Sequence, residues 1–296
     1  MEWPVYYCSL FIGILTFFLW GFIGSSQVMH QVRYQPVITP SDYGLPWERL
    51  QLLTSDQVPI AGWLIPHTNS KGILLLLHGF GTCKADLLDL AKFLHDAGEY
   101  NLVLIDFRGH GASGGDYISF GEYEIQDVRA ALDFLSEEPI LKQLPIGCLG
   151  ISMGGSIGLL AAAQLPQIRA VVSDSAYVDL GKAIARAVRM SYHIPRFPFG
   201  QIVVWATELR LRCNVRNLGP AHAIEKISPR PVMLIHGTKD KTTPYQDAEI
   251  LFQLAKNPKK LWLVQGAEHV GAFFKDKDAY LQQVLEFFKD GLHRTA

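Results

Sequence analysis

The chain alternates between short runs of hydrophobic residues and longer stretches in which hydrophobic residues recur with helical spacing. Unbroken apolar runs bounded by glycine, proline or polar residues are typical of parallel strands that are covered on both faces. The pattern predicts strands at 48–53, 60–65, 73–77, 101–106, 146–150, 168–173, 231–235 and 260–264. The helical spacing predicts helices at 84–97, 121–136, 153–164, 244–255 and 277–289.

This alternation of strands and helices indicates an α/β fold. The strands would form one mostly parallel, eight-stranded sheet with helices on both faces, because parallel neighbours need helical crossovers. The 296 residues, of which 49% are hydrophobic, are enough for one large domain, predicted at 47–296. The net charge of −1 gives no indication of a nucleic acid as partner, and none is expected.

The N-terminal segment departs from this alternation. Residues 5–24 are uncharged and mostly apolar, and twenty helical residues extend about 30 Å, the thickness of the hydrocarbon core of a bilayer. They predict a single-pass N-terminal transmembrane helix, with the membrane anchor at 1–26. The alternative is a secreted protein whose signal peptide is cleaved near Ser25 and Ser26. A signal peptide, however, normally carries Lys or Arg before a shorter apolar run, and the side of the membrane stays open.

A linker at 27–46 is predicted between the anchor and the domain. Its prolines, Pro36, Pro40 and Pro46, are typical of an extended segment. Because the first predicted strand begins only at residue 48, a chain that starts near Gln31 is expected to be soluble and active.

A long segment separates the sixth and seventh predicted strands. Residues 176–228 are too many for a simple crossover, and they are rich in aromatic residues. We predict a small helical lid insertion at 176–228 whose apolar face lines an acyl pocket. An additional pair of helices packed on the core is the alternative.

The most specific chemical signal is the segment Gly150-Ile151-Ser152-Met153-Gly154. A G-x-S-x-G segment between an apolar run and a helical pattern is the sequence form of a nucleophile elbow, a sharp strand-to-helix turn that exposes one serine. The glycines are needed because a Cβ there would strike the neighbouring strand or helix. Ser152 would lie at a helix N-terminus, where the helix dipole favours developing negative charge.

A base and an acid follow Ser152 in the chain. Asp240 and His269 come after the last two predicted strands, so both lie in loops at the carboxyl ends of strands. A serine hydroxyl needs a base to take its proton, and the imidazole of His269 would be that base. Asp240 would fix the tautomer of His269 and stabilise its protonated form. Asp174, after the sixth strand, is the less favoured alternative for the acid, and His236 is expected to order the loop that carries Asp240.

With Ser152, Asp240 and His269 in this order, the chain resembles the α/β-hydrolase superfamily over roughly residues 48–290. Two further segments resemble its bacterial esterase, lipase and serine aminopeptidase-like branches. They are Asp-x-Arg-Gly-x-Gly-x-Ser at 106–113 and His-Gly-x-x-Asp-x-x-x-Pro at 236–244. The resemblance implies the α/β-hydrolase fold and a Ser-Asp-His catalytic triad.

The resemblance also implies an oxyanion hole. In the family, one backbone N–H comes from the loop after the central strand, and the other comes from the residue that follows the nucleophile. Carried over, these are the N–H groups of Phe80 and Met153. His78, just before this loop, is expected to hold the loop, with a role as a second base the less favoured alternative. Asp106 and Arg108 are expected to pin a tight turn near the site, with substrate contact as the alternative.

These observations predict a serine hydrolase that cleaves small-molecule carboxylic esters with apolar acyl groups through an acyl-enzyme. A thioesterase, or a peptidase or amidase, with the same triad is the alternative, and a non-catalytic membrane-tethered binding protein is less favoured. The four cysteines show no spacing typical of a metal site, so neither a metal nor a cofactor is expected.

Overall fold

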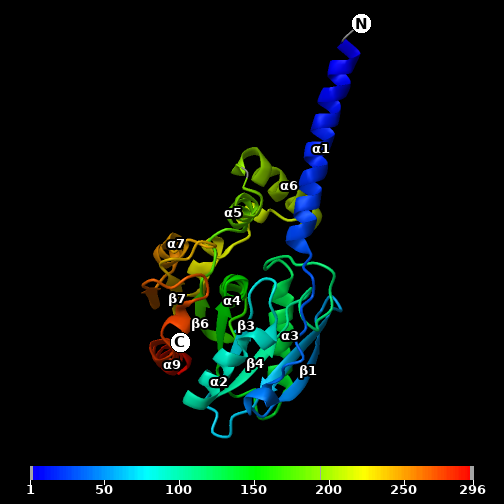
Figure 1. Ribbon diagram of the computed structural model, residues 1–296. Coiled ribbons are helices and arrows are strands. Elements are labelled where there is room, and N and C mark those ends of the chain that lie inside the picture. Colours follow the sequence, from blue (N-terminus) through cyan, green and yellow to red (C-terminus); the bar gives the residue numbers. More distant parts are fainter. Residues whose placement is uncertain (1–2, 194, 294–296) are drawn as a thin grey trace.

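The computed structural model describes residues 3–193 and 195–293, and within them eight strands form one sheet in the order β1-β2-β4-β3-β5-β6-β7-β8 (Figure 1). β1 and β2, and β2 and β4, pair antiparallel, and the other neighbours pair parallel. The predicted mostly parallel, eight-stranded sheet is therefore confirmed. The strands are β1 Glu48–Leu53, β2 Pro59–Ile65, β3 Gly72–Leu77, β4 Tyr100–Ile105, β5 Ile146–Ile151, β6 Ile168–Asp174, β7 Val232–Gly237 and β8 Lys259–Val264.

The helices lie on both faces of this sheet. On one face lie α2 (Leu88–Ala97) and α9 (Lys277–Leu292), and on the other lie α3 (Glu124–Glu137), α4 (Met153–Gln164) and α7 (Gln246–Leu254). The shorter elements are α8 Ala272–Lys275, the 3-10 turns η1 Pro40–Tyr43, η2 Lys84–Leu87, η4 Val215–Asn217, η5 Pro220–His222 and η6 Ile224–Ile227, and the π-turn η3 Arg196–Gly200.

The central strand β3 shows why its sequence is an unbroken apolar run. Leu74 and Leu76 pack in the core under α2 and α9, whereas Ile73, Leu75 and Leu77 pack under α3 and α4. Successive side chains of a strand point to opposite faces, so a strand covered on both faces needs an apolar residue at every position.

The helix predicted from residue 121 begins later, at Glu124. Gly121 has a φ of +120° and therefore cannot start a right-handed helix. The Glu124 carboxylate accepts hydrogen bonds from the backbone N–H groups of Ser119 and Gly121, at 2.7 and 2.6 Å. The carboxylate thus fixes a turn that the apolar spacing alone did not reveal.

The segment between β6 and β7 contains two further helices, α5 (Leu180–Tyr192) and α6 (Gln201–Leu211). The N-terminal helix α1 (Trp3–Met29) projects beyond the domain, with α5 and α6 beside its lower half (Figure 1). Its residues from Tyr6 to Met29 are long and apolar enough to cross a membrane, a property that a signal sequence near an N-terminus shares.

Two glycines allow α1 and α6 to approach closely. A Cβ on Gly21 would lie 2.6 Å from Ile202 Cγ1, and a Cβ on Gly24 would lie 2.8 Å from Val203 Cγ2. A Cβ on Gly13, farther from the domain, would meet nothing within 4 Å. Aromatic rings complete the contact edge to face, in the pairs Phe17–Phe199, Trp20–Phe199, Trp20–Tyr192, Phe18–Trp205 and Phe22–Trp205.

After α1 the chain is held against the domain. The Met29 carbonyl accepts a hydrogen bond from Ile118 N–H at 2.8 Å. The Arg33 guanidinium donates to the Ser113 carbonyl at 2.6 Å, and the Gln35 amide donates to the Gly111 carbonyl at 2.5 Å. Residues 29–35 therefore form a strap across the loop that follows β4.

Candidate active site

Ser152 lies between β5 and α4 in a strained turn. Its φ is +52° and its ψ is −118°, a conformation that non-glycine residues rarely adopt outside functional sites. A Cβ on Gly150 would lie 2.1 Å from the Gly154 carbonyl oxygen, and a Cβ on Gly154 would lie 2.3 Å from the Leu77 carbonyl oxygen. Both positions therefore require glycine, and the local geometry is the strand-turn-helix that the sequence predicts.

The structure brings Ser152, His269 and Asp240 together from three loops at one edge of the sheet. Ser152 Oγ lies 2.9 Å from His269 Nε2, and His269 Nδ1 lies 2.7 Å from Asp240 Oδ2. With its proton on Nδ1, His269 donates to the carboxylate and can accept from the serine hydroxyl. This is the geometry that a general base and its orienting acid require.

The carboxylate of Asp240 is buried and surrounded by hydrogen-bond donors. Its Oδ1 accepts from the backbone N–H groups of Thr242 and Thr243, both at 2.8 Å, and His236 Nε2 lies 3.0 Å from Oδ2. Burial acts to raise the pKa of Asp240, but the hydrogen bonds from His236 and His269 outweigh it, and the pKa is about 2. Asp240 is therefore ionised at neutral pH.

His236 orders the loop that carries Asp240. Besides Asp240, its Nε2 lies 2.8 Å from the Thr243 carbonyl oxygen, so one imidazole joins both ends of this turn. The side chain is completely buried and comes from β7 itself. The geometry matches the role expected from the sequence.

The alternative acid, Asp174, is hydrogen bonded elsewhere. Its Oδ1 accepts from the Ser175 hydroxyl at 2.8 Å, and Ser175 Oγ in turn accepts from Val270 N–H at 3.2 Å. Burial raises the pKa of Asp174 to about 6. Asp174 thus supports the loop beside His269, while His269 itself is hydrogen bonded to Asp240.

The loop that follows β3 lies next to Ser152. A Cβ on Gly79 would lie 3.5 Å from Ser152 Cβ, and Phe80 and Met153 both line the pocket that contains Ser152. Met153 is the first residue of α4, where a backbone N–H has no intrahelical partner. The two residues predicted for an oxyanion hole therefore lie in this loop and at the start of α4, and both line the pocket that contains Ser152.

His78 holds this loop from behind. Its Nδ1 lies 2.7 Å from the Gly79 carbonyl oxygen, and its Nε2 accepts from Phe107 N–H at 3.0 Å. Burial lowers the pKa of His78 to about 3, so the imidazole is neutral. Both nitrogens are occupied by backbone groups, which agrees with the predicted structural role.

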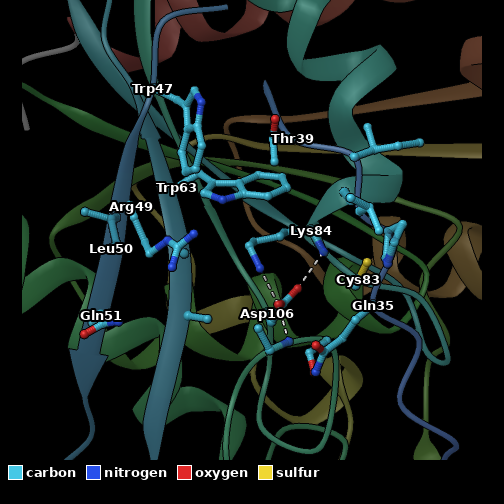
Figure 2. Close-up of a pocket in the computed structure, with 18 residues that line it drawn as sticks. Gln35, Thr39, Trp47, Arg49, Leu50, Gln51, Trp63, Cys83, Lys84 and Asp106 are labelled. Carbon is cyan, nitrogen blue, oxygen red and sulfur yellow. Dashed lines mark hydrogen bonds and ion pairs between the residues drawn. The ribbon is translucent and has the colours of Figure 1, made fainter. Parts of the chain in front are cut away.

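Asp106 pins a turn at a second pocket of 300 Å³ (Figure 2). Its carboxylate accepts from the backbone N–H groups of Lys84 and Ala112, at 2.7 and 2.8 Å, and pairs with the Lys84 ammonium at 2.5 Å. Arg108 is likewise held, by ion pairs to Asp127 at 2.8 Å and to Asp56 at 2.7 Å. Both residues stabilise the loop, as the sequence predicts.

The pocket that contains Ser152 has a volume of 290 Å³, and its described lining is uncharged. α5 supplies much of this lining, including Ile184 and Val188. The sequence did not predict that α1 and the strap also supply four residues. The close spacing of small residues, Gly21 and Gly24, is the signal that would have indicated a packed face of this helix. The complete lining is Gly24, Gln27, Val28, Gln31, Phe80, Phe120, Ser152, Met153, Tyr177, Leu180, Ala183, Ile184, Ala187, Val188, Met190, Ser191, Tyr192, Thr242 and Thr243.

The described part of the chain contains no group of three His, Cys, Asp or Glu residues that could hold a metal ion. A hydroxyl, an imidazole and a carboxylate in this sequence are sufficient for acyl transfer.

Comparison with known families supports this class of chemistry. Residues 68–203 match a family model described as serine aminopeptidase, S33, and residues 199–295 match one described as TAP-like protein. Together, the fold, the sequence motifs and these matches confirm the resemblance of the chain to the α/β-hydrolase superfamily.

Individual relatives are distant. The chain is 28% identical over 233 residues to protein YqkD of Bacillus subtilis, covering 77% of this chain and 74% of the relative. It is 26% identical over 285 residues to the polyketide transferase grgF of a Penicillium species, covering 83% and 97%. Among solved structures, the esterase Pf2001 of Pyrococcus furiosus is similar with a TM-score of 0.74 and 26% identity, covering 89% of this chain and 98% of that one. These similarities support hydrolase activity.

Proposed function

We propose that the protein is a serine hydrolase that cleaves carboxylic esters with apolar acyl groups. The observation that carries this proposal is the hydrogen-bonded series Ser152, His269 and Asp240, whose serine opens into an uncharged pocket. The esterase among the structural neighbours supports the same class of reaction.

In the first half of the reaction, Ser152 Oγ attacks the ester carbonyl while His269 Nε2 takes the hydroxyl proton. Asp240, ionised and fixed by its backbone donors, stabilises the imidazolium that forms. The carbonyl oxygen becomes an oxyanion, for which we propose the backbone N–H groups of Phe80 and Met153 as donors. His269 then gives its proton to the alcohol that leaves, and the acyl group remains on Ser152.

In the second half, water takes the place of the alcohol. His269 removes a proton from the water, the resulting hydroxide attacks the acyl carbonyl, and the proton passes to Ser152 Oγ as the carboxylic acid leaves. A thioester would react through the same steps with a thiol as leaving group, so a thioesterase is retained as the alternative activity.

The lining of the pocket argues against an aminopeptidase. A substrate with a cationic amino terminus would need a carboxylate nearby, because a buried charge without a partner is costly. The described residues that line the pocket include no acidic or basic side chain. An uncharged acyl group fits this surface better.

We also propose that α5 and α6 form a lid over Ser152 and that α1 is a retained single-pass membrane anchor. Ile184 and Val188 of α5 lie in the pocket wall, so this segment covers the serine. A cleavage after Ser26 would remove Gly21 and Gly24 from their contacts with α6 and leave that apolar surface uncovered. A secreted, cleaved form is the alternative, and its N-terminal sequence would identify it.

The direct test is labelling by a fluorophosphonate combined with a substrate panel. The wild-type chain is expected to be labelled at Ser152 and to hydrolyse p-nitrophenyl esters of medium-chain acids faster than aminoacyl amides. Ser152→Ala is expected to lose both the label and the hydrolysis. Labelling at another serine, or undiminished hydrolysis by Ser152→Ala, would refute the proposal.

A further inference from the structure

The C-terminal end of helix α1 and Ser152 line the same pocket. Gly24, Gln27 and Val28, from the last turns of α1, line the same pocket as Ser152, together with Gln31 of the strap. The sequence suggested that the anchor and the domain are independent, with activity retained in a chain that starts near Gln31. In the structure, such a chain would lack Gly24, Gln27 and Val28 of the pocket wall.

The end of α1 is fixed in this position by several contacts. Ser25 and Met29 are buried, at 0% and 3% exposure, and Met29 is hydrogen bonded through its carbonyl to Ile118 N–H. The Tyr192 hydroxyl of α5 donates to the Gln27 side chain. The last turn of α1 is thus bonded both to the domain and to the helix on the other side of the pocket.

The part of α1 that precedes Gly24 presents apolar side chains to its surroundings. Leu10, Phe11, Leu15 and Ile23 are exposed by 62%, 65%, 57% and 51%. Exposed apolar surface of this length along one helix suits the acyl chains of a bilayer. The apolar stretch ends at Ile23, and the pocket wall begins at the next residue, Gly24.

The surface beside Ile23 and Gly24 is also apolar. Met190 and Tyr192, near the end of α5, are 44% and 43% exposed, and both line the pocket. Phe197, in the turn that follows α5, is 78% exposed. An apolar chain leaving the bilayer along α1 would therefore meet apolar side chains of α1 and α5 next to the pocket.

We propose that the last turn of α1 is a wall of the acyl-binding pocket, and that the substrate is an ester whose acyl chain enters from the membrane between α1 and α5. This inference rests on the proposed ester hydrolysis at Ser152. It deepens that function by assigning the substrate class, a membrane-resident lipid ester, and by making Val28 a residue that sets acyl-chain length.

The test uses the full chain in phosphatidylcholine nanodiscs and p-nitrophenyl esters from acetate to palmitate. The measured quantity is the ratio of kcat/KM for laurate to kcat/KM for acetate. Val28→Trp would fill the pocket, and we expect it to lower this ratio at least tenfold. Val32→Trp places the same ring in the strap that follows α1, at a residue that is 93% exposed, and is expected to leave the ratio within twofold of the wild type.

A second variant keeps the test decisive if Val28→Trp does not fold. Val28→Ala enlarges the pocket and is expected to shift the preferred chain length upward, raising the palmitate-to-laurate ratio. An unchanged ratio in the folded Val28 variants would overturn the inference while leaving ester hydrolysis at Ser152 intact. If the wild-type chain hydrolyses no ester and Ser152 takes no fluorophosphonate label, the proposed function fails, and the inference fails with it.

Discussion

Asp106 and Asp240 are two buried carboxylates at the carboxyl ends of strands, and they differ in the partners that they bond. Each accepts hydrogen bonds from two backbone N–H groups and also bonds a basic side chain, and Asp240 has His236 as a second imidazole neighbour beside His269. The partner of Asp106 is Lys84, whose ammonium is enclosed beneath the Trp63 ring, at 4.7 Å from its centroid (Figure 2).

The partner of Asp240 is His269, whose second nitrogen reaches a serine at the wall of a cavity. A buried carboxylate therefore indicates chemistry only when its partner has a second functional atom and access to a substrate. The Lys84 ammonium has only donors and makes a closed ion pair, which stabilises a loop. The neutral imidazole has one donor and one acceptor, so it can donate to Asp240 while it accepts the proton of Ser152.

The largest expected effect is a loss of activity at the site that contains Asp240, His269 and Ser152. Ser152→Ala is expected to lower kcat by about 10⁴-fold or more, because the members of such a set act as a unit. The melting temperature should stay close to that of the wild type, since the partly buried hydroxyl is a single atom at the pocket wall and contributes little packing. Hydrolysis of a p-nitrophenyl ester measures kcat, and a thermal melt measures the melting temperature. A large decrease in the melting temperature would contradict the expectation that Ser152 acts in catalysis and not in stability.

The acid can be tested against its neighbour. Asp240→Asn is expected to lower kcat roughly 10³–10⁴-fold, because the amide no longer enforces the tautomer of His269. Asp174→Asn is expected to have a much smaller effect, since its carboxylate bonds Ser175 and not His269. Steady-state kinetics of the two variants decide between them, and the reverse order would assign the acid to β6.

The buried ion pair between Lys84 and Asp106 is expected to stabilise the folded protein. Lys84→Met leaves the Asp106 charge buried without its partner and is expected to lower the free energy of unfolding by about 3–5 kcal/mol. Lys92→Met, which breaks an exposed pair with Asp96, is the matched control and should cost about 0.5 kcal/mol or less. Urea unfolding monitored by circular dichroism compares them, and equal losses would show that burial does not distinguish the two pairs.

The contact of α1 with the lid gives a smaller effect. Gly24→Val is expected to push α1 away from Val203, at a cost of about 1–3 kcal/mol, and to reduce activity on long-chain esters more than on acetate. Gly13→Val introduces the same side chain where nothing lies within 4 Å of the added Cβ. Equal chain-length profiles for the two variants would mean that this contact does not shape the pocket.

The mildest expected effect concerns pH. Burial raises the pKa of Asp174 to about 6, above its ordinary 3.8, so the folded protein binds more protons than the unfolded chain between these values. Stability contributed by this group is therefore present below pH 4 and decreases as the pH rises to about 6, by about 1.4 kcal/mol for each pKa unit. Asp174→Asn should flatten the curve of unfolding free energy in this window, and an unchanged slope would contradict the assignment.

The strands were predictable to within one or two residues because their signal is local. A strand covered on both faces, such as β3, has to be apolar throughout, and its flanking glycines and polar residues mark its ends. The start of α3 was not predictable in this way. It depends on the Glu124 carboxylate and the positive φ of Gly121, and neither changes the apolar spacing.

The position of Ser152 and the loops of Asp240 and His269 follow from the sequence, because a sharp turn needs Gly150 and Gly154 and because parallel strands bring their carboxyl ends to one edge. The sequence favoured Asp240 over Asp174 as the partner of His269, but the hydrogen bond itself depends on where neighbouring loops meet, which is a property of the tertiary structure. The tertiary structure also decided that the end of α1 lines the pocket. Gly21 and Gly24 mark a face of α1 that can pack closely, but the sequence does not specify its partner, and only the contact with α5 and α6 places this face at the pocket.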